Sequence, residues 1–320
     1  MNGNQPGMDK QSHRDTHPSI AILLGTRNGA RFLKEQLTSI AAQTVGRITL
    51  YVSDDGSSDE TSTILDEFAA SGCCQIIRFE GPRKGFAENY RSLLQRAADT
   101  HDAYMFSDQD DIWYPNKIER GLELLAVTPP GPAGIGGRTR SMTEAGEDAG
   151  FSPLFRRTPA FRNALVQSIA GGNTMILNPD AFRLVRDSSR AGPFVSHDWW
   201  AYIIITAAGG QFVYDKQPTI SYRQHPDNLV GANSGMLARL RRIRNGLAGT
   251  YRRWNDVHMR LLVPNRAYLT EENRVVLDCF NKARTGHLPG RFFALKRSGV
   301  YRQTWLSDVN LMVACLLGKL

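Results

Sequence analysis

The sequence predicts an α/β protein with a mostly parallel central sheet, helices on both of its faces, and a basic, mainly helical C-terminal region. Two observations indicate this class. Short apolar runs alternate with segments of helical periodicity through the first half of the 320-residue chain, and this alternation is typical of parallel sheets. Acidic clusters follow two of the apolar runs, at the strand ends where such sheets bind ligands.

The first half of the chain gives the clearest elements. Residues 19–25 (SIAILLG) form an apolar run bounded by turn residues, which predicts a buried strand. Further short apolar runs predict strands over 48–52, 75–79 and 103–106. Apolar residues at helical spacing predict helices over 31–43, 61–70 and 87–98.

The second half is less regular. Residues 129–150 are rich in Pro and Gly and predict a mobile loop or a short irregular insertion. Regular signal resumes over 168–178, followed by helices over 179–186 and 197–208 and strands over 211–214 and 219–223. We divide the chain into a disordered tail (1–17), an α/β domain (18–235) and a basic helical region (236–320).

Composition excludes several classes of protein. No window holds about 18 uninterrupted apolar residues, which argues against a spanning helix. The polar N-terminus predicts no secretory signal. The four cysteines form no C-x-x-C pair, which favours a reducing compartment and argues against a zinc site.

The net charge of +8 is unevenly distributed. Residues 236–305 hold 15 basic and 4 acidic side chains, whereas residues 1–235 hold 23 and 26. Such a basic segment suits anionic lipid, nucleic acid, a phosphorylated substrate or simply solvent.

The first acidic cluster is Asp54–Asp59 (DDGSSD). Ser57, Ser58 and Asp59 suit the capping of a helix N-terminus. Capping does not require two consecutive acids before the glycine. A carboxylate at a strand end can instead accept a hydrogen bond from a pyrimidine base or from a ribose hydroxyl.

The second cluster is Asp108-Gln109-Asp110-Asp111. Three carboxylates in four residues repel one another unless a cation lies among them. Mg²⁺ and Mn²⁺ take oxygen ligands, commonly one or two carboxylates plus substrate phosphates. In an extended segment Asp108 and Asp110 point the same way, so the pair suits a metal held against a diphosphate. The alternative is a solvated loop with a capping acid.

Together these residues resemble the family 2 glycosyltransferases, which have the nucleotide-diphospho-sugar transferase (GT-A) fold. The motifs that carry the resemblance are ILLGTRNG (22–29), Gln36, Gln43-Thr44, DDGSSD (54–59), Asn89-Tyr90 and FSDQDDIW (106–113). GGNTM (171–175), HDWW (197–200) and YRQH (222–225) resemble the branch that includes rhamnosyltransferases of polysaccharide assembly. The resemblance covers roughly residues 18–232 and makes 18–235 a catalytic domain.

The resemblance implies a role for each motif residue. Thr26 would line the nucleotide pocket, and Asp54 and Asp55 would contact base and ribose in either order. Asp108 and Asp110 would form the Asp-x-Asp pair, with Asp110 the direct ligand of Mn²⁺ or Mg²⁺.

Further residues are candidates of the same kind. Asp198 lies where the family places its catalytic base, although an Asp before a helix is also a common cap. His225 would add a metal or diphosphate contact, against a structural alternative. Lys84, where Asn is common, could meet a phosphate or be an ordinary surface lysine, and Arg27 replaces a usual aromatic. Trp199, Trp200, Gly172 and Asn173 are candidates for a sugar pocket, although tryptophans are more often core.

The implied reaction transfers a sugar from a dTDP- or UDP-sugar to a glycan or lipid-diphosphate-linked acceptor, with inversion. The expected location is cytoplasmic and peripheral at the inner membrane face, where a helix over 236–254 (Leu237, Leu240, Ile243, Leu247) would lie on anionic lipid. A nucleotidyltransferase and a nucleic-acid-binding module are the alternatives. This sequence lacks the Gly-rich loop that a nucleotidyltransferase would show after its first strand. It also contains no recognisable nucleic-acid-binding module, so no nucleic-acid partner is expected.

Overall fold

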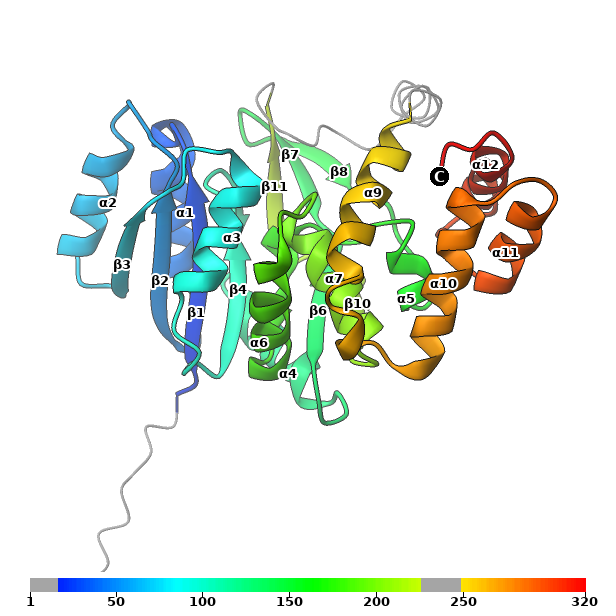
Figure 1. Cartoon of the computed structure of the whole chain (residues 1–320). Helices are drawn as coiled ribbons and strands as arrows, with labels where there is room; N and C mark the ends of the chain where they lie inside the picture. The colour runs from blue at the N-terminus through cyan, green and yellow to red at the C-terminus, as the bar shows by residue number, and fades with distance from the viewer. Residues whose placement is uncertain (1–16, 226–248) are drawn as a thin grey trace, which may run out of the picture.

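The computed structural model describes residues 17–225 and 249–320. A seven-stranded sheet forms its centre (Figure 1). In spatial order the strands are β10 (Gln211–Asp215), β6 (Ala133–Gly137), β9 (Ile176–Leu177), β4 (Ala103–Ser107), β1 (Ser19–Thr26), β2 (Arg47–Asp54) and β3 (Gln75–Glu80). β9 is antiparallel to both neighbours and the other pairs are parallel. The mostly parallel sheet is therefore confirmed.

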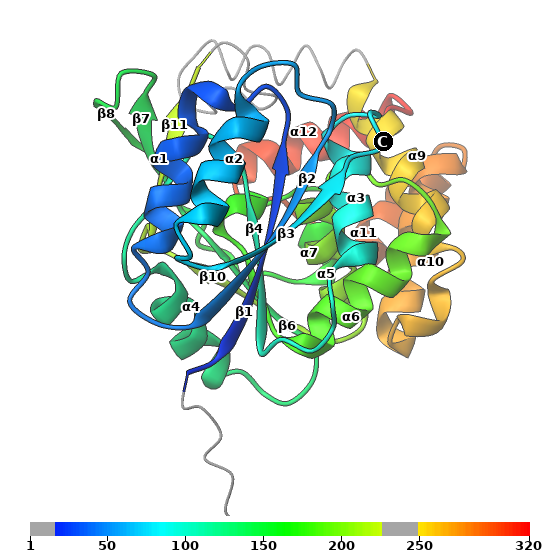
Figure 2. The same cartoon turned by 90° about the vertical axis from the view of Figure 1, so that its left-hand side faces the viewer.

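Helices cover both faces of this sheet (Figure 2). One face carries α1 (Ala30–Ala41), α2 (Thr61–Ala70) and α4 (Lys117–Ala126), and the other carries α3 (Phe86–Arg96), α6 (Pro179–Ser188) and α7 (His197–Ala207). Along β1, Ile22 and Leu24 pack with the first set, whereas Ala21 and Leu23 pack with the second. Burial on both faces explains why this strand is a continuous apolar run.

The predicted strands and helices up to β11 agree with the structure to within two residues at either end. The loop predicted over 129–150 is wrong, because that segment forms β6, β7 (Arg140–Thr143) and β8 (Asp148–Phe151). β6 has the sequence AGIGG, and its glycines allow close packing. A Cβ on Gly136 would lie 2.6 Å from the Cβ of Ala170. Because close packing requires glycines in β6, the segment lacks the apolar pattern that predicts a strand.

A second, four-stranded sheet lies above the central one in Figure 1. Its order is β5 (Ile112–Trp113), β11 (Ile220–Gln224), β7 and β8. β11 pairs antiparallel with β5, where Ile220 faces Trp113, and parallel with β7. This small sheet brings the chain after residue 220 back to the segment that follows β4.

The C-terminal region is helical, as expected. It consists of α9 (Thr250–Leu262), α10 (Glu271–Thr285), α11 (Gly290–Ser298) and α12 (Trp305–Leu316), with a short turn, η3 (Arg266–Tyr268). Short elements in the α/β part are α5 (Phe161–Ala164), η1 (Gly172–Thr174) and η2 (Ser189–Ala191). The C-terminal helices share one hydrophobic cluster with α3, α6 and α7, so they pack on the α/β part.

Several predictions concern residues that the structure does not describe. They are the tail (all but residue 17), the boundary near residue 235, and the apolar stripe of the helix over 236–254. Among the described helices, none has the length and apolar character needed to cross a membrane.

Candidate active site

The two acidic clusters meet at one edge of the central sheet, as predicted. Thr26 and Asp54 are register partners at the ends of β1 and β2, and Ser107 ends β4 on the other side of β1. Because these strands are parallel, their carboxyl ends lie side by side.

Ser57, Ser58 and Asp59 tie two loops together. The Ser58 backbone N–H donates to Asn28 Oδ1 (2.9 Å), and the Asn28 N–H donates to Ser57 Oγ (2.8 Å). Asp59 accepts from the N–H of Ala30 (3.0 Å), the first residue of α1, and from its own neighbour Thr61. Asp59 therefore accepts from the first N–H of both α1 and α2, as the capping interpretation predicts, whereas Ser57 and Ser58 bond to Asn28 in the β1–α1 loop instead.

Asp54 and Asp55 differ in what occupies their oxygens. Asp55 is buried, and its two oxygens accept from the backbone N–H groups of Arg83 (2.5 Å) and Gly85 (2.9 Å). Asp54 accepts from Ser57 through Oδ1 alone. Within the described residues, its Oδ2 has no hydrogen-bond partner. Lys84 is exposed in the loop that Asp55 fixes.

Thr26 is buried, and its hydroxyl donates to Gln109 Oε1 (2.7 Å). The same Gln109 oxygen accepts from the N–H of Arg27 (2.9 Å). Gln109 thus links the β1–α1 loop to the acidic segment after β4. A contact between Thr26 and a nucleotide stays a prediction.

Asp110 and His225 are brought together by the second sheet. Asp110 Oδ2 lies 2.7 Å from His225 Nε2, across 115 residues of chain. Both side chains are mostly buried, at 15% and 10% exposure. An oxygen and a nitrogen ligand therefore adjoin at the end of the Asp-x-Asp segment.

Asp108 completes an acidic centre with Asp110 and Asp198. Burial, and then the negative charges of Asp110 and Asp198, raise the pKa of Asp108 to about 7, against a hydrogen bond from Tyr90 that lowers it. Asp198 lies in the first turn of α7 and accepts from the N–H of Trp199 (2.7 Å). Asp198, distant in sequence, thus shares one electrostatic environment with Asp108 and Asp110.

Asp111 and Arg223 form the framework behind this centre, and the sequence analysis assigned a role to neither. Asp111 is fully buried and accepts from Asn173 Nδ2 (2.6 Å) and from the N–H of Arg223 (3.3 Å). The Arg223 guanidinium contacts the carbonyl of Asp110 (3.1 Å) and the carboxylate of Glu35 on α1 (2.7 Å). Arg223 is 3% exposed. The available signal in the sequence was an arginine at the end of the strand predicted over 219–223.

His197 packs the first turn of α7 against the sheet. It stacks on Tyr90 (ring centroids 3.7 Å) and meets Phe106 edge-on (4.6 Å). A Cβ on Gly172 would lie 2.0 Å from His197 Nε2, so only glycine fits there. Burial lowers the pKa of His197 to about 4.

The sugar-pocket predictions need correction. Trp200 is fully buried and donates from Nε1 to Ser188 Oγ (3.0 Å). Trp199 is 7% exposed, donates to the carbonyl of Ala164 and packs edge-on against His258. Both tryptophans belong to the core, because α9 and α6 cover them. Gly172 and Asn173 are likewise buried, as packing and hydrogen-bonding partners of His197 and Asp111.

The residues fit a divalent cation in part. In residues 17–225 and 249–320, no three His, Cys, Asp or Glu side chains form a metal-binding group. Asp110 and His225 could supply two adjacent ligands, with Asp108 beside them. That is the protein share expected where substrate phosphates and water complete the coordination.

Comparison with known proteins identifies the family of this chain. Residues 21–180, half of the chain, match the family described as glycosyl transferase family 2. The dTDP-rhamnosyl transferase RfbG of Shigella flexneri is 28% identical over 244 residues, which cover 69% of this chain and 78% of that protein. The uncharacterized glycosyltransferase RT0329 of Rickettsia typhi is 32% identical over 108 residues, 34% of this chain and 32% of that one.

Among solved structures, S. aureus TarS 1–349 in complex with UDP-GlcNAc superposes with a TM-score of 0.54. The identity is 11%, and the match covers 94% of this chain and 88% of that one. This likeness shows the fold, which is GT-A. The chain belongs to glycosyltransferase family 2. It is a glycosyltransferase that uses a sugar nucleotide, and it is similar to a rhamnosyl transferase.

Proposed function

We propose that this enzyme transfers a sugar from a nucleoside-diphospho-sugar to a hydroxyl of a glycan or lipid-diphosphate-linked acceptor, in one step with inversion at the anomeric carbon. The observation that carries the proposal is the contact of Asp110 with His225 after β4, next to Asp108, whose carboxyl also feels the charge of Asp198. Family membership favours sugar transfer over nucleotidyl transfer. We further propose a cytoplasmic location.

The nucleoside would lie against the ends of β1 and β2. Asp54 keeps one carboxylate oxygen without a described partner, whereas both oxygens of Asp55 hold the loop at Arg83 and Gly85. We therefore assign the direct base or ribose contact to Asp54, and a supporting role to Asp55. Exposed Lys84, on the loop fixed by Asp55, is placed to approach a phosphate. The Shigella relative's name makes a dTDP-sugar the first donor to test.

The diphosphate would lie beside Asp110 and His225. These two residues would hold Mn²⁺ or Mg²⁺, which supplies neutralisation of the charge that develops on the leaving diphosphate. Asp108 would make the local potential more negative, and its pKa is raised first by burial and then by the neighbouring carboxylates of Asp110 and Asp198.

Asp198 would act as the general base. Its position in the first turn of α7 is fixed, because His197 beside it is packed between Tyr90 and Phe106. One Asp198 oxygen accepts from Trp199, which leaves the other for the acceptor hydroxyl. Asp198 would take that proton while the hydroxyl oxygen attacks the anomeric carbon on the face opposite the leaving nucleoside diphosphate, and this single displacement gives inversion.

The test is donor hydrolysis by the purified full chain. dTDP-, UDP- and GDP-sugars are incubated with Mn²⁺ or with EDTA, and released nucleoside diphosphate is measured. We expect metal-dependent release from one donor, reduced at least about 100-fold in Asp110→Ala. Asp180→Ala, at an exposed position of α6, is the matched control.

Asp198→Asn separates binding from chemistry. It should retain stabilisation by the nucleoside diphosphate in a thermal melt while turnover falls about 100-fold or more. Release that changes neither in EDTA nor in Asp110→Ala, compared with the unmodified chain in Mn²⁺, would refute the metal role. Failure of every nucleoside diphosphate to bind in the presence of metal would refute the donor site.

A further inference from the structure

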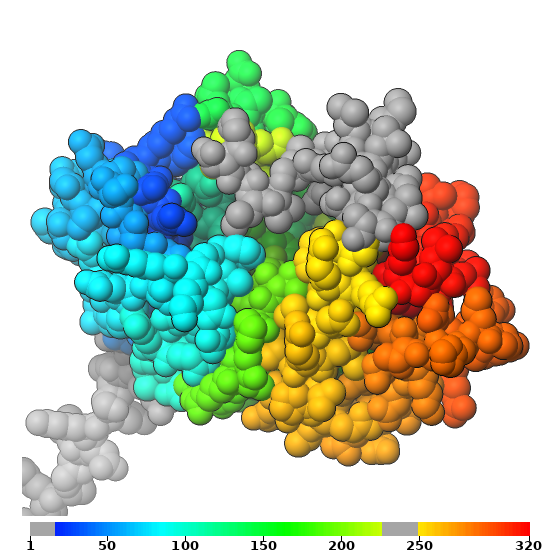
Figure 3. Space-filling view, turned by 45° about the horizontal axis from the view of Figure 1, so that its top comes forward, coloured from blue at the N-terminus to red at the C-terminus, as the bar shows by residue number. Residues whose placement is uncertain are grey.

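α12 presents a row of large apolar side chains to solvent. Trp305 is 75% exposed and Leu317, just past the helix, is 55% exposed. The apolar face of α12 consists of Trp305, Leu306, Val309, Met312, Val313, Leu316 and Leu317. Their spacing of three and four residues places them on one side of the helix. Figure 3 shows α12 on the surface, in red beside the orange α11.

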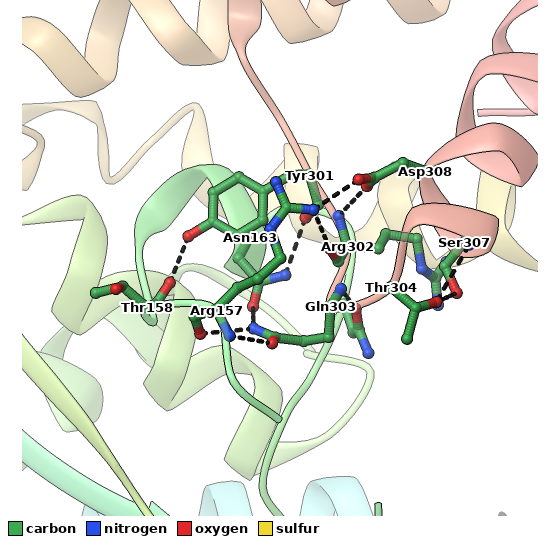
Figure 4. A network of polar contacts seen from close by, with 10 residues as sticks. Arg157, Thr158, Asn163, Tyr301, Arg302, Gln303, Thr304, Ser307 and Asp308 are labelled. Carbon is green, nitrogen blue, oxygen red and sulfur yellow. Dashed lines mark hydrogen bonds and ion pairs between the residues drawn. The ribbon is translucent and has the colours of Figure 1, made fainter. Parts of the chain in front are cut away.

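The other side of α12 is anchored, so this face is turned outward by the fold. Leu311 and Cys315 are buried in the main hydrophobic cluster. At the N-terminal end, Arg157 of the catalytic part bonds Asp308 Oδ2 and the carbonyl of Arg302, both at 2.6 Å (Figure 4). Gln303 donates to the carbonyl of Arg157 (3.0 Å). The polar residues around the helix start thus face the protein.

The surroundings of the apolar face are basic. Residues 282–320 hold seven Lys and Arg and a single acid, Asp308, which is paired with Arg157. Lys296 and Arg297 end α11, and Phe293 on that helix is 65% exposed. Exposed aromatic and aliphatic side chains in a strongly basic segment are typical of helices that lie in the surface of an anionic bilayer. A second copy of this chain would oppose cation to cation.

α12 also lies at the functional end of the molecule. In Figure 1, β1 begins at the bottom and ends at the top in the left part of the view, and α12 lies at the top right, so α12 shares the end of the sheet that carries the site but lies across the molecule from β1. We propose that the apolar face of α12 docks on the surface of an anionic lipid membrane. Presentation of a lipid-linked acceptor to the site follows only if the proposed function holds, but the docking itself does not depend on it.

The test is flotation of the full chain with vesicles of phosphatidylcholine, with and without phosphatidylglycerol. The double substitution Leu306→Glu with Val313→Glu should lower the fraction bound to anionic vesicles by at least about tenfold. Val127→Glu with Val263→Glu adds the same charge at two exposed apolar positions elsewhere and should bind as the unmodified chain does. Lys296→Gln and Arg297→Gln should each weaken binding about fivefold.

Thermal melts show whether the glutamate variant folds, and Trp305→Ser with Leu316→Ser provides a second, uncharged test. Absence of binding to anionic vesicles would overturn the proposal, as would equal losses in the control pair. If light scattering shows a dimer that the α12 substitutions dissociate, the face joins two copies instead. Donor hydrolysis without vesicles should be the same in all these variants, so a failure of docking is distinguishable from a failure of the proposed function.

Discussion

Substituting Gly172 by alanine perturbs the proposed base without touching it. The new Cβ would lie 2.0 Å from His197 Nε2, whereas ordinary contacts begin at 3.4 Å, so about 1.4 Å of movement is required. The imidazole cannot swing aside, because Tyr90 stacks on it and Phe106 meets its edge. The displacement therefore passes to the backbone of η1 or of the first turn of α7, which carries Asp198.

Two effects of different size follow. Overpacking of this kind lowers the free energy of unfolding by about 1–3 kcal/mol. A shift of about 1 Å in a catalytic group costs about 100-fold in rate. We expect turnover of the donor to fall about 100-fold. The affinity for the nucleoside diphosphate should stay within about twofold, because Asp54 lies at the end of β2 and belongs to neither η1 nor α7.

The assay combines turnover with binding of the nucleoside diphosphate. Gly290→Ala, where a Cβ meets nothing within 4 Å, is the matched control. In a His197→Ala background the clash is absent, so Gly172→Ala should cost at least about tenfold less in turnover there than in the unmodified chain. A Gly172→Ala enzyme that is less stable but fully active would refute the coupling between His197 and Asp198.

Two predictions concern stability. Burial lowers the pKa of His258 to about 3 and that of His197 to about 4. The unfolded chain therefore binds protons that the native state excludes, and the free energy of unfolding should fall as pH drops from about 6.5 towards 4, by up to about 1.4 kcal/mol per pH unit for each histidine. Urea titrations at pH 7 and pH 5 measure this change in the free energy of unfolding. His258→Phe should reduce the change, and an equal change in that variant would refute the role of His258. Gly136→Ala brings a Cβ to 2.6 Å from Ala170, and a urea titration should show a loss of about 1–3 kcal/mol; an unchanged midpoint would show that β6 can shift.

The strands and the acidic clusters at their carboxyl ends could be predicted from the sequence, whereas the buried residues behind the site could not. β1 was recognisable because both its faces are buried, and the acidic clusters were visible because they directly follow strands. Local pattern therefore sufficed for the donor side. The strand β6 escaped notice because its glycines serve contacts with Ala170 and Phe212 that only the tertiary structure creates.

The same limit explains the residues whose roles were missed or wrong. Asp111 looked like a third acid of a cluster, yet it faces inward to Asn173. Trp199 and Trp200 follow the proposed base directly, but helical geometry turns them into the core while Asp198 faces the acidic centre. Which side chains of a helix turn point into the core depends on the elements that pack around the helix, and a single sequence does not show these.

The pairing of Asp110 with His225 also sets an order of events during synthesis. Because chains emerge from the ribosome N-terminus first, the edges of β1, β2 and β4 exist before residue 225 has been made. β11 must then close on β5 and β7 before the histidine can reach its aspartate. A nascent chain that stops short of β11 therefore has no His225 beside Asp110, and the proposed metal pair forms only after β11 has been translated.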